Sequence, residues 1–189
     1  ENIEVLVDKF NSGIVRALGK AITLIENREP ESKILLEKIN SKTGKAQIIG
    51  FTGSPGAGKS SLIDILISHI RKNNLKVGVI AIDPSSPFTG GAILGDRIRM
   101  IQHSIDKGVF IRSMANRGHV GGLGIATKES IKLLDAFGFD VIIVETVGTG
   151  QTEVDIIKTA DTVVVVQNPE AGDDIQAIKA GIMEIADIF

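Results

Sequence analysis

Residues 47–61 read QIIGFTGSPGAGKSS, an apolar run followed by a glycine-rich turn, a lysine and two serines. The segment Gly53–Ser60 matches the pattern GxxxxGK[ST] at every defined position. In this pattern, backbone N–H groups turn inward around phosphate oxygens, and the following helix directs its positive N-terminal end at the same anion. We therefore predict a strand over residues 47–52, a phosphate-binding turn over Gly53–Ser60, and a helix over Ser61–Lys72.

The residues of this turn have expected parts in binding a nucleoside triphosphate. Lys59 would supply a point charge to the terminal phosphates, and the hydroxyl of Ser60 is the expected Mg²⁺ ligand. The position of the pattern between a predicted strand and a predicted helix favours this reading over a chance glycine-rich turn. The residues expected to surround the phosphates are Gly53, Ser54, Pro55, Gly56, Ala57, Gly58, Lys59, Ser60 and Ser61.

The chain downstream of the turn alternates strands and helices. The expected strands are Val77–Ile82, Val109–Ser113, Val141–Glu145 and Thr162–Gln167. The expected helices are Asp96–Ile105, Gly124–Phe137, Glu153–Ala160 and Asp173–Glu184. The strands are continuous β-branched runs, as expected when helices cover both faces of a parallel sheet. We predict an α/β fold with a doubly wound, mainly parallel sheet, the architecture of a P-loop NTPase.

The first 45 residues have a different pattern. Apolar residues recur at helical spacing from Val5 to Leu24, and a second short amphipathic helix is expected over Lys33–Ile39. A polar linker follows. We therefore divide the chain into a helical N-terminal extension, residues 1–45, and a P-loop GTPase-type domain, residues 46–189.

The composition argues against several classes of function. The 189 residues carry a net charge of −2, which gives no electrostatic reason to expect nucleic acid or a membrane as partner. The chain has no Trp or Tyr to stack on bases, and no Cys for disulfides or thiolate metal sites. We find no leader and no apolar run near the roughly 18 residues of a membrane span, so we expect a cytoplasmic protein.

Carboxylates follow two predicted strands, at the edge where ligands of open α/β sheets bind. Asp83 and Glu145 end these strands, and Asp96 opens a helix after a Ser/Pro/Gly-rich segment. With Ser60, these three acids are candidate Mg²⁺ ligands, and Asp83 and Glu145 are candidate catalytic residues that help to place the attacking water. Asp83 as a turn former and Asp96 as a helix cap are the simpler alternatives.

Two loops have the character of nucleotide switches. Residues 145–148 read ETVG and occupy the place of the Asp-x-x-Gly switch of P-loop GTPases, where the N–H of Gly148 would meet the γ-phosphate. Gln151 is the nearest amide that could orient water, and with Lys59 it completes our set of catalytic candidates. A solvated loop residue is the alternative for Gln151, and a plain surface connection is the alternative for the second expected switch, residues 85–95.

Several longer motifs resemble those of a single family. The motifs are GSPGAGKSS at 53–61, DPSSP at 83–87, GDRIRM at 95–100, ETVGTGQTE at 145–153 and GDDIQAIKAGIMEIADIF at 172–189. Together with RALGKAITLIE at 16–26, they resemble the methylmalonyl-CoA mutase-associated GTPases, G-protein chaperones of cobalamin enzymes that were once labelled LAO/AO transport system kinases. The resemblance implies a chaperone that binds GTP and Mg²⁺, releases GDP, and gates cofactor loading into a cobalamin-dependent acyl-CoA mutase, its partner.

The resemblance also assigns residues. It implies a switch over residues 168–179 that communicates with the mutase. It implies a phosphate–Mg²⁺ site made of Lys59, Ser60, Asp83, Asp96 and Glu145.

The resemblance has a consequence for base recognition and oligomeric state. The family continues from a strand like residues 186–189 into an Asn-Lys-x-Asp motif and a dimerisation arm, and no Asn-Lys-x-Asp occurs in these 189 residues. We therefore expect a truncated chain with little preference for guanine over adenine, and a homodimer for a full-length protein. The alternatives are a P-loop kinase or ATPase that phosphorylates a small molecule or transport-system protein, and a nucleotide-binding module without turnover.

Overall fold

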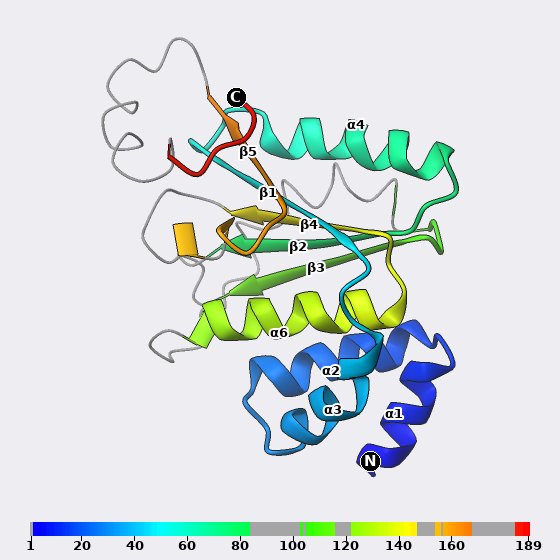
Figure 1. Ribbon diagram of the computed structural model, residues 1–189. Coiled ribbons are helices and arrows are strands. Elements are labelled where there is room, and N and C mark those ends of the chain that lie inside the picture. Colours follow the sequence, from blue (N-terminus) through cyan, green and yellow to red (C-terminus); the bar gives the residue numbers. More distant parts are fainter. Residues whose placement is uncertain are drawn as a thin grey trace.

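The computed structural model describes residues 2–83, 103, 105–115, 122–146, 154–155, 157–167 and 184–189. In this part of the chain, a parallel sheet lies between two long helices, and three shorter helices lie beyond one of them (Figure 1). The strands are β1 (Gln47–Gly53), β2 (Val77–Asp83), β3 (Val109–Ala115), β4 (Val141–Thr146) and β5 (Thr162–Val166). The predicted α/β class is confirmed.

The strand order explains why one edge of the sheet gathers the functional residues. The order is β3-β2-β4-β1-β5, and every neighbouring pair is parallel. All five carboxyl ends therefore lie at the same edge. The register places Glu145 of β4 opposite Phe51 of β1 on one side and Ala81 of β2 on the other.

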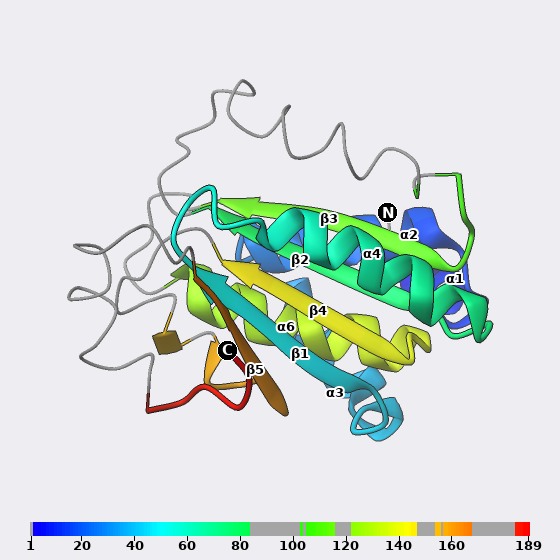
Figure 2. The ribbon, with the colours of Figure 1, turned by 90° about the horizontal axis from the view of Figure 1, so that it is seen from above.

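Each face of the sheet is covered by a helix. Successive side chains of a strand point to opposite faces. Val79 and Ile143 therefore pack in the cluster of α4 (Lys59–Lys72), whereas Ile80 and Val144 pack in the cluster of α6 (Gly122–Phe137). From above, α4 lies in front of the sheet and α6 behind it (Figure 2). Burial on both faces is the reason that the strands are apolar without alternation.

Three N-terminal helices form a further layer, which we call the helical extension. They are α1 (Ile3–Asn11), α2 (Val15–Glu26) and α3 (Glu31–Ile39). They pack on the side of α6 that faces away from the sheet (Figure 1). The apolar periodicity that we read as continuous from Val5 to Leu24 belongs to two helices, because the chain turns between Asn11 and Val15. The turn preserves the spacing of the buried side chains, so periodicity alone does not reveal it.

Polar contacts join the helical extension to the rest of the fold. Arg112 of β3 forms an ion pair with the buried carboxylate of Glu26 at the end of α2, and it also donates to Thr23 Oγ1 at 3.1 Å. The extension and the sheet thus share one core, and an ion pair joins them. The division of the chain at residue 45 stays a prediction.

Two of the predicted helices cannot be compared with the structure. The helix over 96–105 and most of the helix over 173–184 lie outside the described residues. Of the predicted helix over 153–160, residues 154–155 and 157 are helical. Within the described ranges, the structure contains no helix long and apolar enough to cross a membrane.

Candidate phosphate-binding site

Three glycines of the turn between β1 and α4 have positive φ angles, and two of them, Gly53 and Gly58, stand at its ends. Gly53 ends β1 with φ 132°, and a Cβ there would lie 2.9 Å from the carbonyl carbon of Val166 and closer still to its oxygen. Gly58 precedes α4 with φ 95° and leaves the N-terminus of that helix without a side-chain cap. The first glycine thus lets β5 approach, and the second turns the chain into a helix whose N-terminal N–H groups are suited to an anion.

The side chain of Lys59 lies inside the turn. Its ammonium donates to the carbonyl oxygens of Gly53 at 2.8 Å and Ser54 at 2.9 Å, and the residue is only 5% exposed. A buried ammonium needs such partners because it has lost its hydration. The charge expected at this position is therefore present, and the backbone of the turn itself holds it there.

Ser60 and Glu145 meet at the start of α4. The hydroxyl of Ser60 donates to Glu145 Oε1 at 2.9 Å, and both residues are buried. These two candidates, from the start of α4 and the end of β4, are therefore in direct contact. Mg²⁺ prefers oxygen ligands and is commonly held by one or two carboxylates with phosphates and waters. A hydroxyl and a carboxylate side by side fit such an ion.

Not every candidate can be placed. The backbone of Asp83 ends β2 next to β4, with Ile82 opposite Thr146. The side chain of Asp83 lies outside the described part, as do all of Asp96, Gly148 and Gln151. The expected switch over residues 85–95 and residues 147–153 of the other expected switch also lie outside it. Among the described residues, no group of three or more His, Cys, Asp or Glu has the geometry of a metal site.

The sequence did not single out Asp135, which anchors the chain just before β1. Its carboxylate accepts from the backbone N–H groups of Gly44, Lys45 at 3.2 Å and Ala46 at 3.0 Å. Because β1 runs from this anchor to the turn, Asp135 of α6 fixes one end of the strand that carries the site. One feature of the sequence could have pointed to Asp135: it is an acidic residue that stands between the apolar residues Leu134 and Ala136 within a predicted helix.

A second group of charged residues lies towards the other end of α4. Arg71 donates to both carboxylate oxygens of Asp106 at 2.9 and 3.0 Å. These hydrogen bonds, with one from the N–H of Gly108, lower the pKa of Asp106, and the same pair raises the pKa of Arg71. His103 Nε2 contacts Asp64 Oδ1 at 2.8 Å. Both contacts tie the surface of α4 to residues near the start of β3.

The sequence of this chain is similar to those of known proteins. A model of the family described as "Methylmalonyl Co-A mutase-associated GTPase MeaB" matches residues 18–189. A Pyrococcus horikoshii protein named as a GTPase is 63% identical over 187 residues, covering 99% of this chain and 59% of its own. The Escherichia coli GTPase ArgK is 41% identical over 187 residues, covering 97% of this chain and 56% of its own.

A more distant relative comes from an animal. The mitochondrial methylmalonic aciduria type A homolog of Caenorhabditis elegans is 37% identical over 203 residues, covering 100% of this chain and 51% of its own. The chain thus spans between 51% and 59% of the length of these three relatives.

This chain also superposes on solved structures. A crystal structure of an LAO/AO transport system kinase superposes with a TM-score of 0.75 at 32% identity, covering 98% of this chain and 55% of that one. The signal recognition particle receptor FtsY from Elizabethkingia anophelis, at 18% identity and a TM-score of 0.53, shares the fold. The fold is that of a P-loop NTPase.

Proposed function

Because the chain belongs to the family of methylmalonyl-CoA mutase-associated GTPases, we propose that it binds GTP with Mg²⁺ and hydrolyses it to GDP and phosphate. The observation that carries this proposal is the contact between Ser60 and Glu145 beside the ammonium of Lys59. It brings together a cation for phosphate and a pair of oxygens for a metal ion at an uncapped helix N-terminus.

The residues of the turn act by position and charge. Phosphate oxygens that enter the turn would compete with the carbonyls of Gly53 and Ser54 for the ammonium of Lys59. The ammonium would then bind the phosphates. The hydroxyl of Ser60 and the carboxylate of Glu145 would hold Mg²⁺, which when bound neutralises charge on the phosphate oxygens. The backbone from Gly53 to Ser61 surrounds the phosphates.

The remaining candidates complete the proposal. Glu145 would help to position the attacking water. Asp83 and Asp96 would add carboxylate oxygens to a metal site. The N–H of Gly148 meets the γ-phosphate, and Gln151 orients the water.

Single-turnover hydrolysis tests this arrangement. Removing Glu145 takes away a contact that acts mainly in the transition state, so Glu145→Ala should slow hydrolysis on the order of a hundredfold or more while GTP affinity changes far less. Glu37→Ala, an exposed acid on α3, is the matched control and should hydrolyse GTP at the wild-type rate. Normal turnover with weakened binding in Glu145→Ala would give this residue a structural role and refute the proposal for it.

The same assay separates the alternatives. Release of phosphate to water supports the GTPase, transfer to an added acceptor supports a kinase, and binding without either supports a module without turnover. Competition of GDP against ADP tests the expectation of weak base discrimination. A GDP preference of a hundredfold or more would locate base recognition within these 189 residues.

We further propose that the protein serves as a G-protein chaperone of a cobalamin-dependent methylmalonyl-CoA mutase. The description of the family and the name of the Caenorhabditis elegans relative support this partner. Nucleotide would gate cofactor loading and protection through the loops at residues 85–95, 146–153 and 168–179. A full-length homodimer in the cytoplasm, without nucleic acid or membrane partners, belongs to the same proposal. Co-elution with the mutase that changes between GDP and a GTP analogue would support it, whereas no co-elution in either state would refute it.

A further inference from the structure

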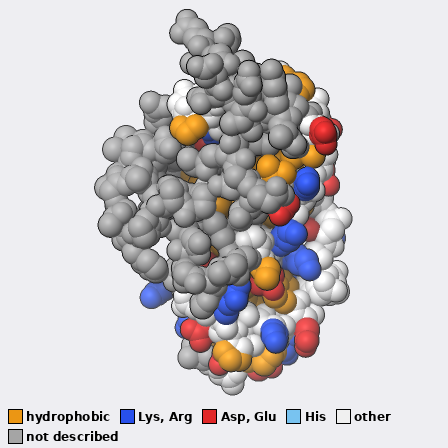
Figure 3. Space-filling view, turned by 90° about the vertical axis from the view of Figure 1, so that its left-hand side faces the viewer, with side chains coloured by type: hydrophobic (Ala, Val, Ile, Leu, Met, Phe, Trp, Pro, Cys, Tyr) orange, Lys and Arg blue, Asp and Glu red, His pale blue; other side chains and the backbone are white. Residues whose placement is uncertain are grey.

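The last residue of β4 is a threonine that lies outside the proposed phosphate–Mg²⁺ site. Thr146 follows Glu145 directly and is fully buried. Because successive side chains of a strand point to opposite faces, Glu145 lies on the face covered by α4, and Thr146 lies with Val144 on the face covered by α6. Figure 3 looks onto the edge of the sheet at which β4 ends. Thr146 can therefore influence the site through the position of Glu145.

The hydroxyl of Thr146 links β4 to β1 beyond the end of their ladder. The register of the two strands runs from Gln47 opposite Val141 to Phe51 opposite Glu145. One residue further along β4, the hydroxyl of Thr146 donates to the carbonyl oxygen of Phe51 at 3.4 Å. Buried hydroxyls are normally hydrogen-bonded. This bond is long, so we expect it to matter for the position of the strand end more than for overall stability.

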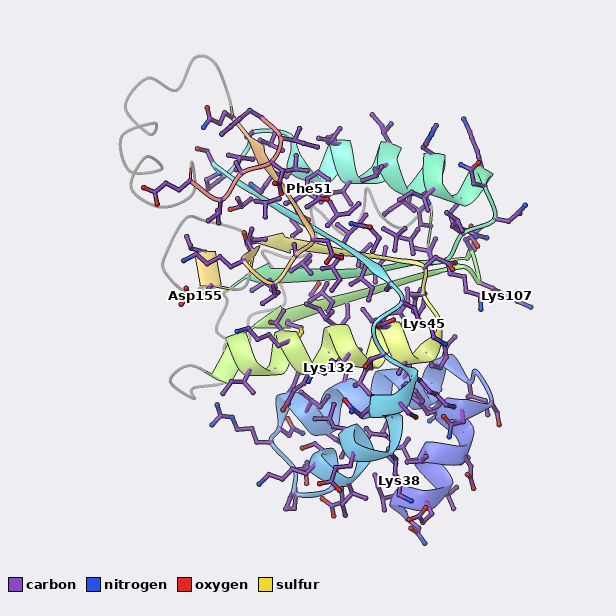
Figure 4. The ribbon with its side chains drawn as sticks, viewed as in Figure 1. Lys38, Lys45, Phe51, Lys107, Lys132 and Asp155 are labelled. Atoms are coloured by element: carbon purple, nitrogen blue, oxygen red, sulfur yellow. The ribbon has the colours of Figure 1, made fainter. Side chains whose placement is uncertain are left out.

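Phe51 is a firm point of attachment for this link. Its side chain is buried and packs in one cluster with Ile63 and Ile67 of α4. In Figure 4 it lies between β1 and α4. The same helix carries Ser60 at its N-terminal end. The carbonyl that accepts from Thr146 thus belongs to the packed unit that also holds Ser60.

The position of Glu145 depends on how the end of β4 is held. On the side of β2, the ladder continues to Ile82 opposite Thr146. On the side of β1, the ladder stops at Glu145, and the hydroxyl of Thr146 supplies the next link. Loss of this link would free the end of β4 to move away from β1, and the carboxylate of Glu145 to move away from the hydroxyl of Ser60. Groups that bind a ligand productively must stay within about 0.5 Å of their places.

We propose that Thr146 is a positioning residue that keeps Glu145 against Ser60 for the binding of Mg²⁺. The proposal rests on the proposed function and adds to it a residue that touches neither metal nor nucleotide. Thr146 acts by tying the strand that carries Glu145 to the strand that leads into the phosphate-binding turn. Loss of its hydroxyl therefore weakens the use of Mg²⁺ and leaves the binding of nucleotide without metal unchanged.

Single-turnover GTP hydrolysis over a range of Mg²⁺ concentrations tests the proposal. Thr146→Val removes the hydroxyl and keeps the shape of the side chain. Residues that support a metal ligand typically change metal affinity by about 10- to 100-fold, so for a link through the backbone we expect the half-maximal Mg²⁺ concentration to rise about tenfold. The affinity for GDP without Mg²⁺ should not change. Thr162→Val, the same substitution at the start of β5, is the matched control and should need no more Mg²⁺ than the wild type.

Further comparisons separate positioning from a merely structural role. Thr146→Ser keeps a hydroxyl and should restore the wild-type Mg²⁺ requirement, whereas Thr146→Ala should behave as Thr146→Val does. In a Glu145→Ala background, Thr146→Val should cause no further loss of single-turnover rate, because its effect passes through Glu145. Without nucleotide, the amide chemical shift of Ser60 in the ¹⁵N-labelled chain should change in Thr146→Val and stay in place in Thr162→Val. Circular dichroism checks that each variant is folded.

Three kinetic outcomes would overturn the proposal. The first is an unchanged Mg²⁺ requirement in a folded Thr146→Val variant, and the second is an equal rise in Thr162→Val. The third is a full further loss of rate in the Glu145→Ala background, which would show that Thr146 acts independently of Glu145. Failure of the proposed function is distinguishable, because the wild-type chain would then not hydrolyse GTP. The amide shift of Ser60 needs no turnover, and no change of it in Thr146→Val would refute the positioning role in either case.

Discussion

The first glycine of the phosphate-binding turn should matter for folding even without nucleotide. In the structure, a Cβ on Gly53 would overlap the carbonyl oxygen of Val166 and lie 2.9 Å from its carbon. Both atoms belong to the backbone of β5, which pairs with β1 at this position, so neither can swing away as a side chain would. The Gly53→Ala substitution must therefore separate the two strands locally.

The loss of unfolding free energy expected for Gly53→Ala has two contributions. Overpacking costs typically 1–3 kcal/mol, and an unfavourable φ such as the 132° of Gly53 costs about 1–3 kcal/mol more. Gly58 supplies a matched control, since it has φ 95° but a Cβ there meets no described atom within 4 Å. Gly58→Ala should therefore cost only about 1–2 kcal/mol.

Urea unfolding of the two variants without nucleotide, followed by circular dichroism, measures this difference. We expect Gly53→Ala to lose about 3–4 kcal/mol of unfolding free energy, which is a large part of the 5–15 kcal/mol typical of a domain. Equal losses in the two variants would refute the reasoning. They would show that the conformation of the turn, and not the approach of β5, requires glycine at position 53.

Two other predictions concern contacts away from the site. Asp135→Ala leaves the N–H groups of residues 44–46 without their carboxylate, so urea unfolding should show a loss of roughly 2–3 kcal/mol, and no loss would refute the anchor. The pKa of Asp106 is lowered mainly by Arg71, so the pair stabilises the fold above the ordinary carboxyl pKa and loses this effect as the pH falls through the lowered pKa. Because both side chains are partly exposed, Asp106→Asn should lower the free energy of unfolding by under about 1 kcal/mol at pH 7, and by less at pH 3. Urea unfolding measures both values. An equal loss at the two pH values would contradict a lowering of the pKa of Asp106 by Arg71.

The fold could be predicted from the sequence because its signals are local. The pattern of residues 53–60 specifies a turn between a strand and a helix, and the β-branched runs specify strands buried on both faces. Every described strand begins at the predicted residue, and the ends differ by one or two residues. The turn between α1 and α2 could not be predicted, because the apolar spacing continues through it.

The candidate site could be predicted only in part. The proximity of Ser60 and Glu145 follows from the rule that the carboxyl ends of parallel strands share an edge. The anchor at Asp135 and the ion pair of Glu26 with Arg112 join residues 86 to 91 positions apart. Such contacts depend on how the layers pack, and a single sequence gives no direct signal for them.

Lys59 shows how the site is held in the absence of nucleotide. From the sequence we expected its charge to be directed at the terminal phosphates of the ligand. In the structure, the ammonium bridges the carbonyls of Gly53 and Ser54 and thus closes the turn upon itself. Under the proposed function, nucleotide binding would exchange one set of hydrogen bonds for another, and the turn would lose part of its internal support.

Substitution of Lys59 should therefore have two effects that can be measured separately. Lys59→Ala should abolish triphosphate binding in a nucleotide titration, because the point charge is lost. It should also speed hydrogen exchange of the turn amides without nucleotide, since two carbonyls lose their donor, while circular dichroism still shows a folded domain. Lys59→Met, which keeps the length and apolar stem, should behave in the same way if the ammonium is responsible. Unchanged triphosphate affinity in a folded Lys59→Ala variant would refute the phosphate-binding assignment, whereas unchanged exchange at Gly53 and Ser54 would show that the turn is held by other contacts.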